Sequence, residues 1–454
     1  MGIEKKSHHK LIKKLINTQR TEALRGLLKD LDVVEIMNSF LQLKLKYQLD
    51  LLEALPKEIA SDVLAQLHNY SPVFTEVVEQ MNAETLGGLI EEMDGDDAAD
   101  VVAVLDEEKA DEILGSLPLK EREEITNLMK YDSESAGGIM DPDVVAVQKE
   151  HTVAKAIQEI RKYTVKEDIE KFYIVYVIDE FQHLIGFVDI HKLLLTEATA
   201  FIKDLMDPNV VAVDVEMDQE HVANIVREYD LVVVPVIDKY LKLIGRITID
   251  DVMDVLNEEF YEDLGHIAGT GDEEVLETSV FRTSKDRIPW LILGLVGGFG
   301  AALAMESFAV YLEKLPEVMY FIPLIAALGG NIAIQSSSII VRGLGTGEIQ
   351  ATDLFVRLWK ELRVSFLNGP VCAIILFGMV LLLTDNLTMG IVAGCALIAV
   401  VVLATVVGSA VPMLLKRVNI DPALATGPFI TTANDLLGVI VYLSITLTFT
   451  DIPV

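Results

Sequence analysis

Asp435 lies in the middle of an apolar stretch, at about 425–449, that is long enough to cross a membrane. A carboxyl group inside a bilayer is costly, so such a group usually faces water, an ion or a polar partner. No basic residue lies at a similar depth to neutralise it, and Thr431 and Gly438 share its helical face. These features predict a cation path past Asp435. The alternative is a structural carboxyl group that is hydrogen-bonded between helices.

A second polar stretch, Leu328-Gly-Gly-Asn-Ile-Ala-Ile-Gln335, interrupts another apolar segment. Asn331 and Gln335 are i,i+4 neighbours, and we expect Gly329 and Gly330 to loosen the helix and present backbone carbonyls. Oxygen donors of this kind suit hard cations such as Mg²⁺ or Ca²⁺, although interhelical hydrogen bonding is an equal alternative. Asp421, just before the last apolar stretch, is a candidate for the cytosolic entrance, against ordinary solvation of an interfacial acid.

Apolar segments of spanning length number five, and their basic flanks predict their orientation. They cover about 288–312, 319–341, 364–384, 388–415 and 425–449. Nearly all Lys and Arg residues of the connecting loops fall on one side, which is therefore expected to be cytoplasmic. This predicts a multi-pass plasma (inner) membrane protein with cytoplasmic N-terminal domains and the C-terminus outside.

Charge is divided very unevenly along the 454 residues. The formal net charge is −33, yet the part from Arg287 onward holds 8 basic and 10 acidic residues, so the first 286 residues carry 29 basic and 60 acidic ones. Such an acidic soluble half argues against nucleic acid as a partner. It favours divalent cations, or it keeps the domain soluble.

Just ahead of the first span, the segment 248–263 is predicted to be an acidic helix. Asp251, Asp254, Glu258 and Glu262 recur at three- or four-residue spacing, which places them on one face. Like charges at this spacing destabilise a helix unless a counter-charge arrives. We therefore expect divalent cations to bridge this face to another acidic surface, with a merely solvated face as the alternative.

An internal repeat lies between the acidic N-terminal helices and this segment. Met140-Asp-Pro-Asp-Val-Val-Ala-Val147 recurs as Met206-Asp-Pro-Asn-Val-Val-Ala-Val213, and each copy continues into a helix, a β-hairpin pattern and a closing helix. The pair resembles tandem cystathionine-β-synthase (CBS) domains. Before it, short apolar-periodic segments punctuated by Pro and Gly predict a helical superhelix.

With this order of parts and the Thr-Thr-Ala-Asn-Asp-Leu-Leu-Gly motif at 431–438, the chain resembles the MgtE-type magnesium transporters. The expected fold is a multidomain membrane protein: an α-helical superhelical N-domain (1–131), two α/β CBS domains (132–203 and 204–247), an acidic linker or plug helix (248–282) and a five-helix transmembrane pore domain (283–454).

The resemblance implies a homodimer in a lipid bilayer, with Asp435 of each subunit meeting on the two-fold axis and binding hydrated Mg²⁺, beside Asn434 of the motif. It also implies regulatory Mg²⁺ on acidic residues of the three cytosolic parts. These are Asp94 and Asp97 within the stretch Asp94–Asp97, Asp218, Glu220 and Asp230 in the second CBS domain, and Asp251, Asp254, Glu259, Glu262 and Asp263 in the linker.

The implied function is Mg²⁺ uptake that closes when cytosolic Mg²⁺ is high. Some members bind ATP in their CBS domains, but His191 and Lys192 stand here where an Arg-Asp pair is expected, which argues against it. The alternatives are transport of Co²⁺, Mn²⁺ or Ca²⁺, or a membrane-anchored CBS sensor. The soluble half has no Ser/His/Asp or Cys/His set, so no enzyme activity is expected.

Overall fold

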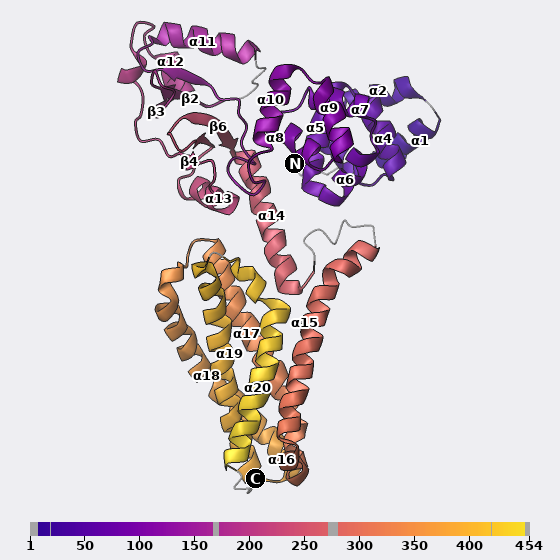
Figure 1. The fold of residues 1–454 in the computed structure, drawn as a ribbon, viewed down its shortest axis with the longest axis vertical. Coiled ribbons are helices and arrows are strands. Elements are labelled where there is room, and N and C mark those ends of the chain that lie inside the picture. Colours follow the sequence, from indigo (N-terminus) through magenta and orange to yellow (C-terminus); the bar gives the residue numbers. More distant parts are fainter. Residues whose placement is uncertain (1–7, 19, 167–171, 271–279, 419, 450–454) are drawn as a thin grey trace. The chain divides into compact units, whose positions relative to one another are not determined.

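The fold is that of a computed structural model, which describes residues 8–18, 20–166, 172–270, 280–418 and 420–449 (Figure 1). Part of the predicted linker, 271–279, and the predicted outer tail, 451–454, lie outside these ranges. The chain divides into two compact units, Met1–Glu258 and Glu259–Val454, and each is treated by itself.

The first unit begins with a series of short helices, as the periodicity predicts. They are α1 (His9–Asn17), α2 (Thr21–Lys29), α3 (Val33–Phe40), α4 (Leu45–Ala54), α5 (Lys57–Leu67), η1 (His68–Tyr70), α6 (Ser71–Gln80), α7 (Ala83–Ile90), α8 (Gly95–Ala103), α9 (Glu107–Ser116) and α10 (Leu119–Leu128). Asp32, Asn82 and Asp106 each accept a backbone N–H in the first turn of the helix they precede. Such caps replace the hydrogen bonds that a helix start lacks.

The internal repeat forms two small sheets of the same topology. The first has β1 (Ala146–Gln148), α11 (Val153–Lys166), β2 (Ile174–Ile178), β3 (Leu184–Asp189), α12 (Ile190–Leu195) and η2 (Ile202–Asp204). The second has β4 (Val213–Asp214), α13 (Gln219–Glu228), β5 (Val233–Ile237) and β6 (Leu243–Thr248). In each, the first strand pairs parallel with the second and the second antiparallel with the third. The predicted strand–helix–hairpin–helix order is thus confirmed.

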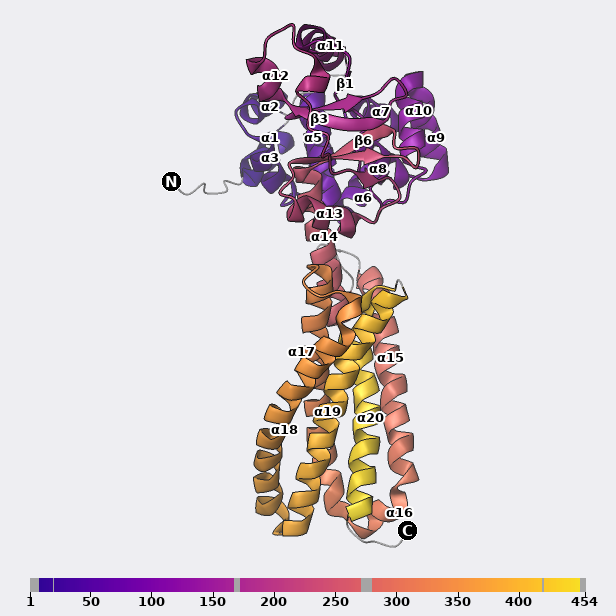
Figure 2. The ribbon, with the colours of Figure 1, turned by 90° about the vertical axis from the view of Figure 1, so that its left-hand side faces the viewer.

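The hairpins of the two repeats lie side by side (Figure 2). The Leu184 N–H donates to the Leu241 carbonyl at 3.0 Å, and the Leu243 N–H donates to Gln182 at 3.3 Å. The cores differ, however. Buried Val, Ile and Leu side chains of the first repeat form a cluster of their own, whereas those of the second repeat join the core of the N-terminal helices.

Helix α14 (Ile249–Ala268) follows β6 directly, as the acidic pattern predicts. Its Val252 and Val255 are buried in the core that the second repeat shares with the N-terminal helices. The first turns of the acidic helix are therefore anchored by apolar packing. The acidic N-terminal part and the start of α14 belong to one packed body.

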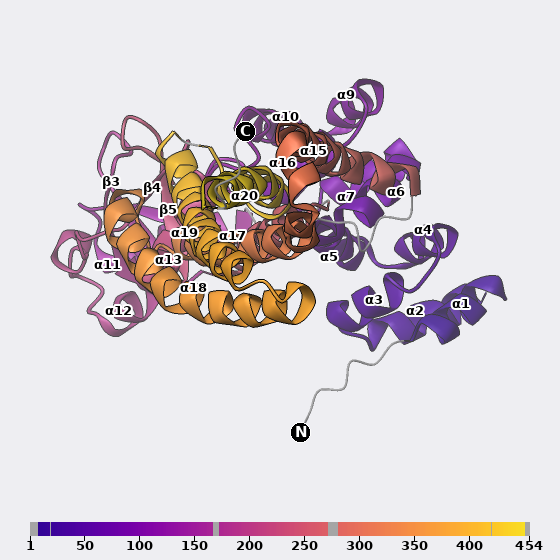
Figure 3. The same cartoon turned by 90° about the horizontal axis from the view of Figure 1, so that it is seen from below.

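Within its described residues, the second unit contains five helices that are long and apolar enough to cross a membrane. They are α15 (Val280–Ser307), α17 (Ile322–Gly345), α18 (Leu354–Thr384), α19 (Leu387–Arg417) and α20 (Gly427–Phe449), with the shorter α16 (Ala309–Lys314), η3 (Pro316–Phe321), η4 (Ala351–Asp353) and η5 (Pro422–Ala425) between them. Figure 3 shows α18 and α15 on opposite sides of a group formed by α17, α19 and α20.

The predicted bounds of two spans are wrong. The first helix ends at Ser307, not near 312, because the chain breaks at Phe308 before α16. The third begins at Leu354, ten residues before the predicted 364, so Arg357 and Lys360 lie on helix and not in a loop. An apolar criterion misses a helix that extends beyond its apolar part.

The prediction that Gly329 and Gly330 loosen their helix is also wrong, since α17 continues through both. The glycines instead permit close packing. A Cβ atom at Gly329 would lie 3.1 Å from Val400 of α19, and one at Gly330 would lie 3.2 Å from Thr431 of α20.

Candidate functional site

Four carboxyl groups from three segments gather where α8 meets the start of α14. Asp96 and Asp97 lie in the first turn of α8, Asp141 lies in the first repeat motif, and Asp251 lies in the first turn of α14. The charges of Asp141 and Asp251 raise the pKa of both Asp96 and Asp97. We call Asp96, Asp97, Asp141 and Asp251 the acidic cluster.

Burial is the main cause of the raised pKa values in this cluster. It raises the pKa of Asp97 to about 7, with further increases from Asp94, Asp100 and Asp251. It raises the pKa of Asp96 well above its ordinary value. The pKa of Asp251 rises to about 6 in spite of hydrogen bonds from Thr248. Near neutral pH, ionisation of these groups opposes the packed arrangement, which a proton or a divalent cation would favour.

Asp141 differs because it has a basic partner. Nε and Nη2 of Arg246 donate to its Oδ2 at 2.8 and 2.7 Å. Burial nevertheless raises the pKa of Asp141 to about 6. Sequence reasoning overlooked both residues, although Asp141 lies in the repeat motif Met140-Asp141-Pro142 and was therefore visible.

Of the positions predicted within Asp94–Asp97, Asp97 is half-buried and lies within the electrostatic reach of Asp251, whereas Asp94 is exposed at the cap of α8. Asp96, the neighbour that the prediction did not single out, is likewise affected by the charges of Asp251 and Asp141, which raise its pKa. The acidic linker thus approaches the predicted stretch Asp94–Asp97 through Asp251, in the first turn of α14.

The predicted residues of the second repeat lie apart from that cluster on the surface. Asp218 caps α13 by accepting the backbone N–H groups of Glu220 and His221. Asp218, Glu220 and His221 offer ligand atoms within 4.8 Å of one another. Asp230 is exposed and has a positive φ of 53°. Asp218, Glu220 and His221 thus make a small open group of donors.

The remaining acids of α14 spread along the helix. Asp254, Glu259 and Asp263 are half-buried, and Glu258 is exposed. Glu262 lies on the same helical face as His266, one turn later. The acids therefore recur along α14 with the predicted spacing, but they differ in burial and in the residues that they contact.

Glu262, His266 and Asp421 form a second group of donors, within the unit Glu259–Val454. Nε2 of His266 lies 3.3 Å from Glu262 Oε1 and 3.7 Å from Asp421 Oδ2. The hydrogen bond from His266 lowers the pKa of Glu262. The group links the end of α14 to the segment that precedes α20. Sequence reasoning proposed both acids separately and missed the histidine.

Gly427 explains how this end of α14 comes so close. Its φ is +49°, and a Cβ atom there would lie 3.0 Å from the His266 carbonyl oxygen. A residue with a side chain would be strained by the φ and by this contact. Helix α20, which bears Asp435, therefore begins against the last turn of α14.

Within the membrane helices, Asp435 lies half-buried on α20 and faces α17. A Cβ atom at Gly330 would be 3.8 Å from Asp435 Oδ1. The neighbouring Asn434 is buried and donates from Nδ2 to the Gly329 carbonyl at 3.2 Å. The Gly-Gly pair and the Asn-Asp pair, more than 100 residues apart in sequence, thus lie against each other.

Thr431 and Gly438 flank Asp435 on α20. Thr431 donates to the Gly427 carbonyl at 2.9 Å, and Gly438 is buried against Val400. Asn331 and Gln335 of α17 are exposed. Two polar side chains one turn apart on the open face of a spanning helix are costly next to lipid. Their exposure disfavours the alternative in which Asn331 and Gln335 form hydrogen bonds with other helices of the same chain.

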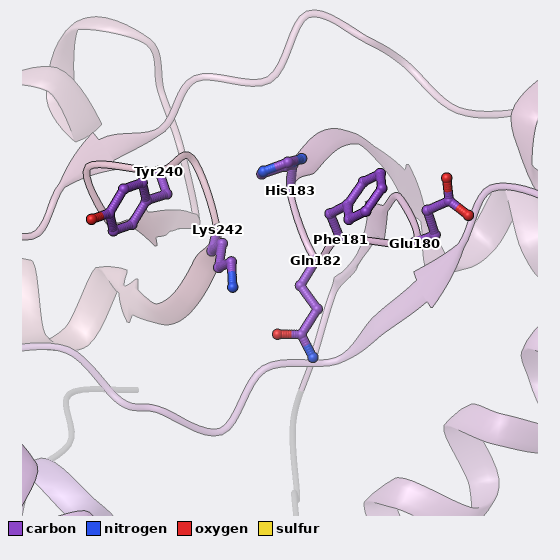
Figure 4. A pocket seen from close by; sticks show the side chains of 6 residues that line it. All are labelled: Glu180, Phe181, Gln182, His183, Tyr240 and Lys242. Carbon is purple, nitrogen blue, oxygen red and sulfur yellow. The ribbon is translucent and has the colours of Figure 1, made fainter.

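An open pocket of about 600 Å³ lies between the hairpin turns of the two repeats. Figure 4 shows Lys242 and Gln182 extending into the gap from either side, with His183, Phe181, Glu180 and Tyr240 around it. None of these residues is a predicted site residue. The pocket has a mixed polar lining and no close group of ligating carboxylates.

Three family profiles match successive parts of the chain. The profile described as "MgtE intracellular N domain" matches residues 31–134, the CBS domain profile matches 136–197 and 202–258, and the MgtE profile, described as "Divalent cation transporter", matches 322–445. Their order agrees with the order of the parts described above.

Curated relatives and a solved structure agree with these profiles. The magnesium transporters MgtE of Enterococcus faecalis and Thermus thermophilus are 33% and 31% identical to this chain over 326 and 328 residues, which is 72% of this chain and 71% and 72% of theirs. That of Bacillus subtilis is 30% identical over 72% of both chains.

A crystal structure of the cytosolic domain of the Mg²⁺ channel MgtE in complex with ATP is 30% identical, with a TM-score of 0.50, and covers 54% of this chain and 98% of that one. Together these matches make the chain a member of the MgtE family of divalent cation transporters.

Proposed function

We propose that this protein is an Mg²⁺ channel or transporter for magnesium uptake whose ion path passes Asp435. The family consists of transporters and not of enzymes, and the similar curated proteins are magnesium transporters. The observation that carries the proposal is the placement of Asp435 against Gly330, where its carboxylate has no basic side chain at similar depth to neutralise it. A carboxylate in that setting favours a cation.

The assembly that we propose for this path is a homodimer. Asn331 and Gln335 lie on an open face of α17 in the single chain, and Asp435 is only half-buried beside it. A second copy on that face would remove these oxygen donors from lipid and would enclose an ion path. Carboxylate, amide and carbonyl oxygens suit a hydrated Mg²⁺ better than a soft metal.

Gating by cytosolic Mg²⁺ rests on the two groups of donors at either end of α14. Ionisation of the acidic cluster destabilises the packing of α8 against α14, because its carboxylates are buried and repel one another. Bound Mg²⁺ would offset this repulsion and would stabilise that packing. At the other end, Glu262, His266 and Asp421 tie α14 to the start of α20. Because linkage is reciprocal, the closed state must bind Mg²⁺ more tightly than the open one.

We propose that the soluble unit lies in the cytosol. If five spans follow it, the connections between spans two and three and between spans four and five lie on the same side of the membrane as this unit. These connections and their flanks carry the basic residues Arg342, Arg357, Lys360, Lys416 and Arg417, and basic residues concentrate on the cytoplasmic side. The C-terminus then lies outside. An impermeant cysteine reagent on single-cysteine variants at the inner and outer loops would check this orientation.

ATP is a second ligand to be tested, since a relative's cytosolic domain binds it. In this chain Lys192 forms an ion pair with Asp189 at 3.2 Å, in the segment where the resemblance expects an Arg-Asp pair. We therefore expect weak or no ATP binding at the first repeat. Equilibrium dialysis with labelled ATP, with Lys192→Asp as a comparison, tests this.

Transport of Co²⁺, Mn²⁺ or Ca²⁺ is the alternative cargo, and competition among these ions for flux separates it from Mg²⁺. The decisive experiment is Mg²⁺ uptake into liposomes by the full chain, by Asp435→Asn and by Glu306→Gln. The first variant is expected to fall below roughly a tenth of wild-type flux, because the charge that stabilises the ion is lost. Glu306, an exposed acid of α15, is the matched control. Undiminished flux in Asp435→Asn would overturn the pore assignment, and equal loss in both variants would make it unspecific.

The gating part has its own test. Removal of residues 1–247 should leave Mg²⁺ flux that no longer stops at high internal Mg²⁺. Full closure in the truncated protein would contradict gating by the cytosolic half.

A further inference from the structure

The first two helices of this acidic protein carry a positive surface. Residues 8–29 contain six Lys or Arg residues and one Glu, a net charge of +5, so the rest of the chain carries −38. All six basic side chains are exposed: Lys10, Lys13, Lys14, Arg20, Arg25 and Lys29. We call these six residues the basic surface.

The basic surface has no ion-paired acid within the described part of the chain. Among the residues that the structure describes, none of the six forms an ion pair, and Lys13 instead lies over the ring of Tyr47, 5.2 Å from its centroid. The only acid of the two helices is Glu22. Asp50 and Glu53 of α4 line an open hollow together with Arg20, so the positive charge that is available to an external partner lies mainly on the other five bases.

The fold holds these charges on a rigid support. Ile12 of α1 and Leu24 and Leu28 of α2 are buried in the core of the N-terminal helices, so the opposite faces must point outward. Lys10 and Lys14 are one turn apart on the outer face of α1, next to Leu11, which is 44% exposed. The basic side chains thus form a fixed surface with an apolar residue among them.

A solvating cap does not explain the sign of this charge. The end of a helical array needs a polar outer face, but the exposed charged side chains of the other N-terminal helices are mostly acidic. The family's N-domain profile begins only at residue 31, so the basic helices precede the part that the profile describes.

We propose that the basic surface docks on the anionic phospholipid surface of the membrane in which the protein lies. Groups of four to eight Lys and Arg residues bind such surfaces, with about 1 kcal/mol, or about fivefold in affinity, for each base. The five spans keep the surface close to lipid at a high effective concentration. The exposed Leu11 beside the bases suits a bilayer interface, where an apolar side chain is buried at the boundary of headgroups and acyl chains.

The acidic remainder of the cytosolic half is repelled by the same lipid surface. Docking would thus orient the N-terminal helices with α1 and α2 towards the bilayer. It would make the arrangement of the cytosolic half sensitive to lipid composition and to salt.

The test uses the full chain with Cys372→Ala, Cys395→Ala and Thr18→Cys, since Thr18 continues the outer face of α1 one turn beyond Lys14. A fluorophore on residue 18 is measured in liposomes that contain nitroxide-labelled lipid. Quenching is expected with 30% phosphatidylglycerol, but not with phosphatidylcholine alone, and it should disappear in 0.5 M salt.

Three variants complete the design. Lys10→Gln, Lys13→Gln and Lys14→Gln together should lower docking about 100-fold, while the same three changed to Arg should retain it. Lys57, Lys120 and Lys130, all exposed elsewhere on the N-terminal helices, changed to Gln should also retain it. Equal quenching in both lipids, or equal loss in the two Gln triplets, would overturn the proposal. If the fluorescence of the label on residue 18 changed with protein concentration and not with lipid charge, the basic surface would instead bind an acidic face of a second protein molecule.

Discussion

Replacement of Asp97 by Asn is expected to stabilise the Mg²⁺-free cytosolic unit. Burial and neighbouring carboxylates raise the pKa of Asp97 from 3.8 to about 7. A raised pKa means that protonation favours the folded state: the stability is complete below 3.8 and is lost as the pH rises to about 7. The difference corresponds to about 4 kcal/mol. With half of that lost to solvent screening, Asn should add about 2 kcal/mol at pH 8.

The assay is thermal unfolding of residues 1–270 in EDTA and in saturating Mg²⁺. A gain of about 2 kcal/mol should raise Tm by about 4–8 °C at pH 8 for a unit of this size. At pH 5 the gain should shrink to about a third, because Asp97 is then protonated in the folded state. Wild type should gain more Tm from Mg²⁺ than the variant, since the variant has lost one ligand and one repulsive charge.

Asp111→Asn is the control, because Asp111 is an exposed acid on α9 of the same domain. It should leave both Tm and the Mg²⁺ response unchanged. The reasoning is refuted if Asp97→Asn lowers Tm at pH 8 in EDTA. It is equally refuted if wild type and variant respond alike to Mg²⁺.

Three further predictions concern other contacts. Arg246→Met leaves Asp141 buried without its partner and should cost about 3 kcal/mol in urea unfolding at pH 8, with a smaller loss for Arg246→Lys; equal stability of Arg246→Met and wild type would contradict the pairing. Gly408→Ala should reduce thermal stability and flux, because its Cβ atom would lie 2.5 Å from the Ala333 carbonyl oxygen. Gly378→Ala is the control and should be neutral, because the space around Gly378 is open. If the two alanine variants behaved alike, the packing of α19 on α17 would be contradicted. His266→Ala should raise the internal Mg²⁺ needed for half-closure about fivefold without changing maximal flux; His183→Ala serves as control, and a loss of maximal flux in His266→Ala would assign it to the pore.

Much of the architecture was accessible from sequence because it depends on patterns that repeat. The five apolar stretches, the duplicated Met-Asp-Pro motif and the spacing of acids on α14 each correspond to an observed element. The errors occur where a pattern is locally weak. The polar start of α18 carries Arg357 and Lys360, so hydropathy placed it in a loop, and the break at Phe308 has no Pro or Gly to signal it.

Sequence spacing singled out Asp97 and Asp251 of the candidate site, but it missed Asp96, Asp141 and His266, and it did not predict how the residues group. Asp97 and Asp251 come together because Val252 and Val255 join the core of the N-terminal helices, a contact that sequence spacing does not specify. His266 had no distinguishing pattern, and it gains meaning only because Gly427 brings α20 to the end of α14. The Gly-Gly pair was read as flexibility when its effect is close packing.

Mg²⁺ current through the reconstituted full chain tests the central claim most directly. Current is recorded across a planar bilayer at fixed voltage while Mg²⁺ on the side of the soluble unit is raised stepwise. We expect current at low Mg²⁺ that falls to zero as that Mg²⁺ rises, and no Mg²⁺ current at any concentration from Asp435→Ala. An Asp435→Ala channel that conducts Mg²⁺ like wild type would contradict the ion path, and a wild-type current that ignores Mg²⁺ on that side would contradict the gate.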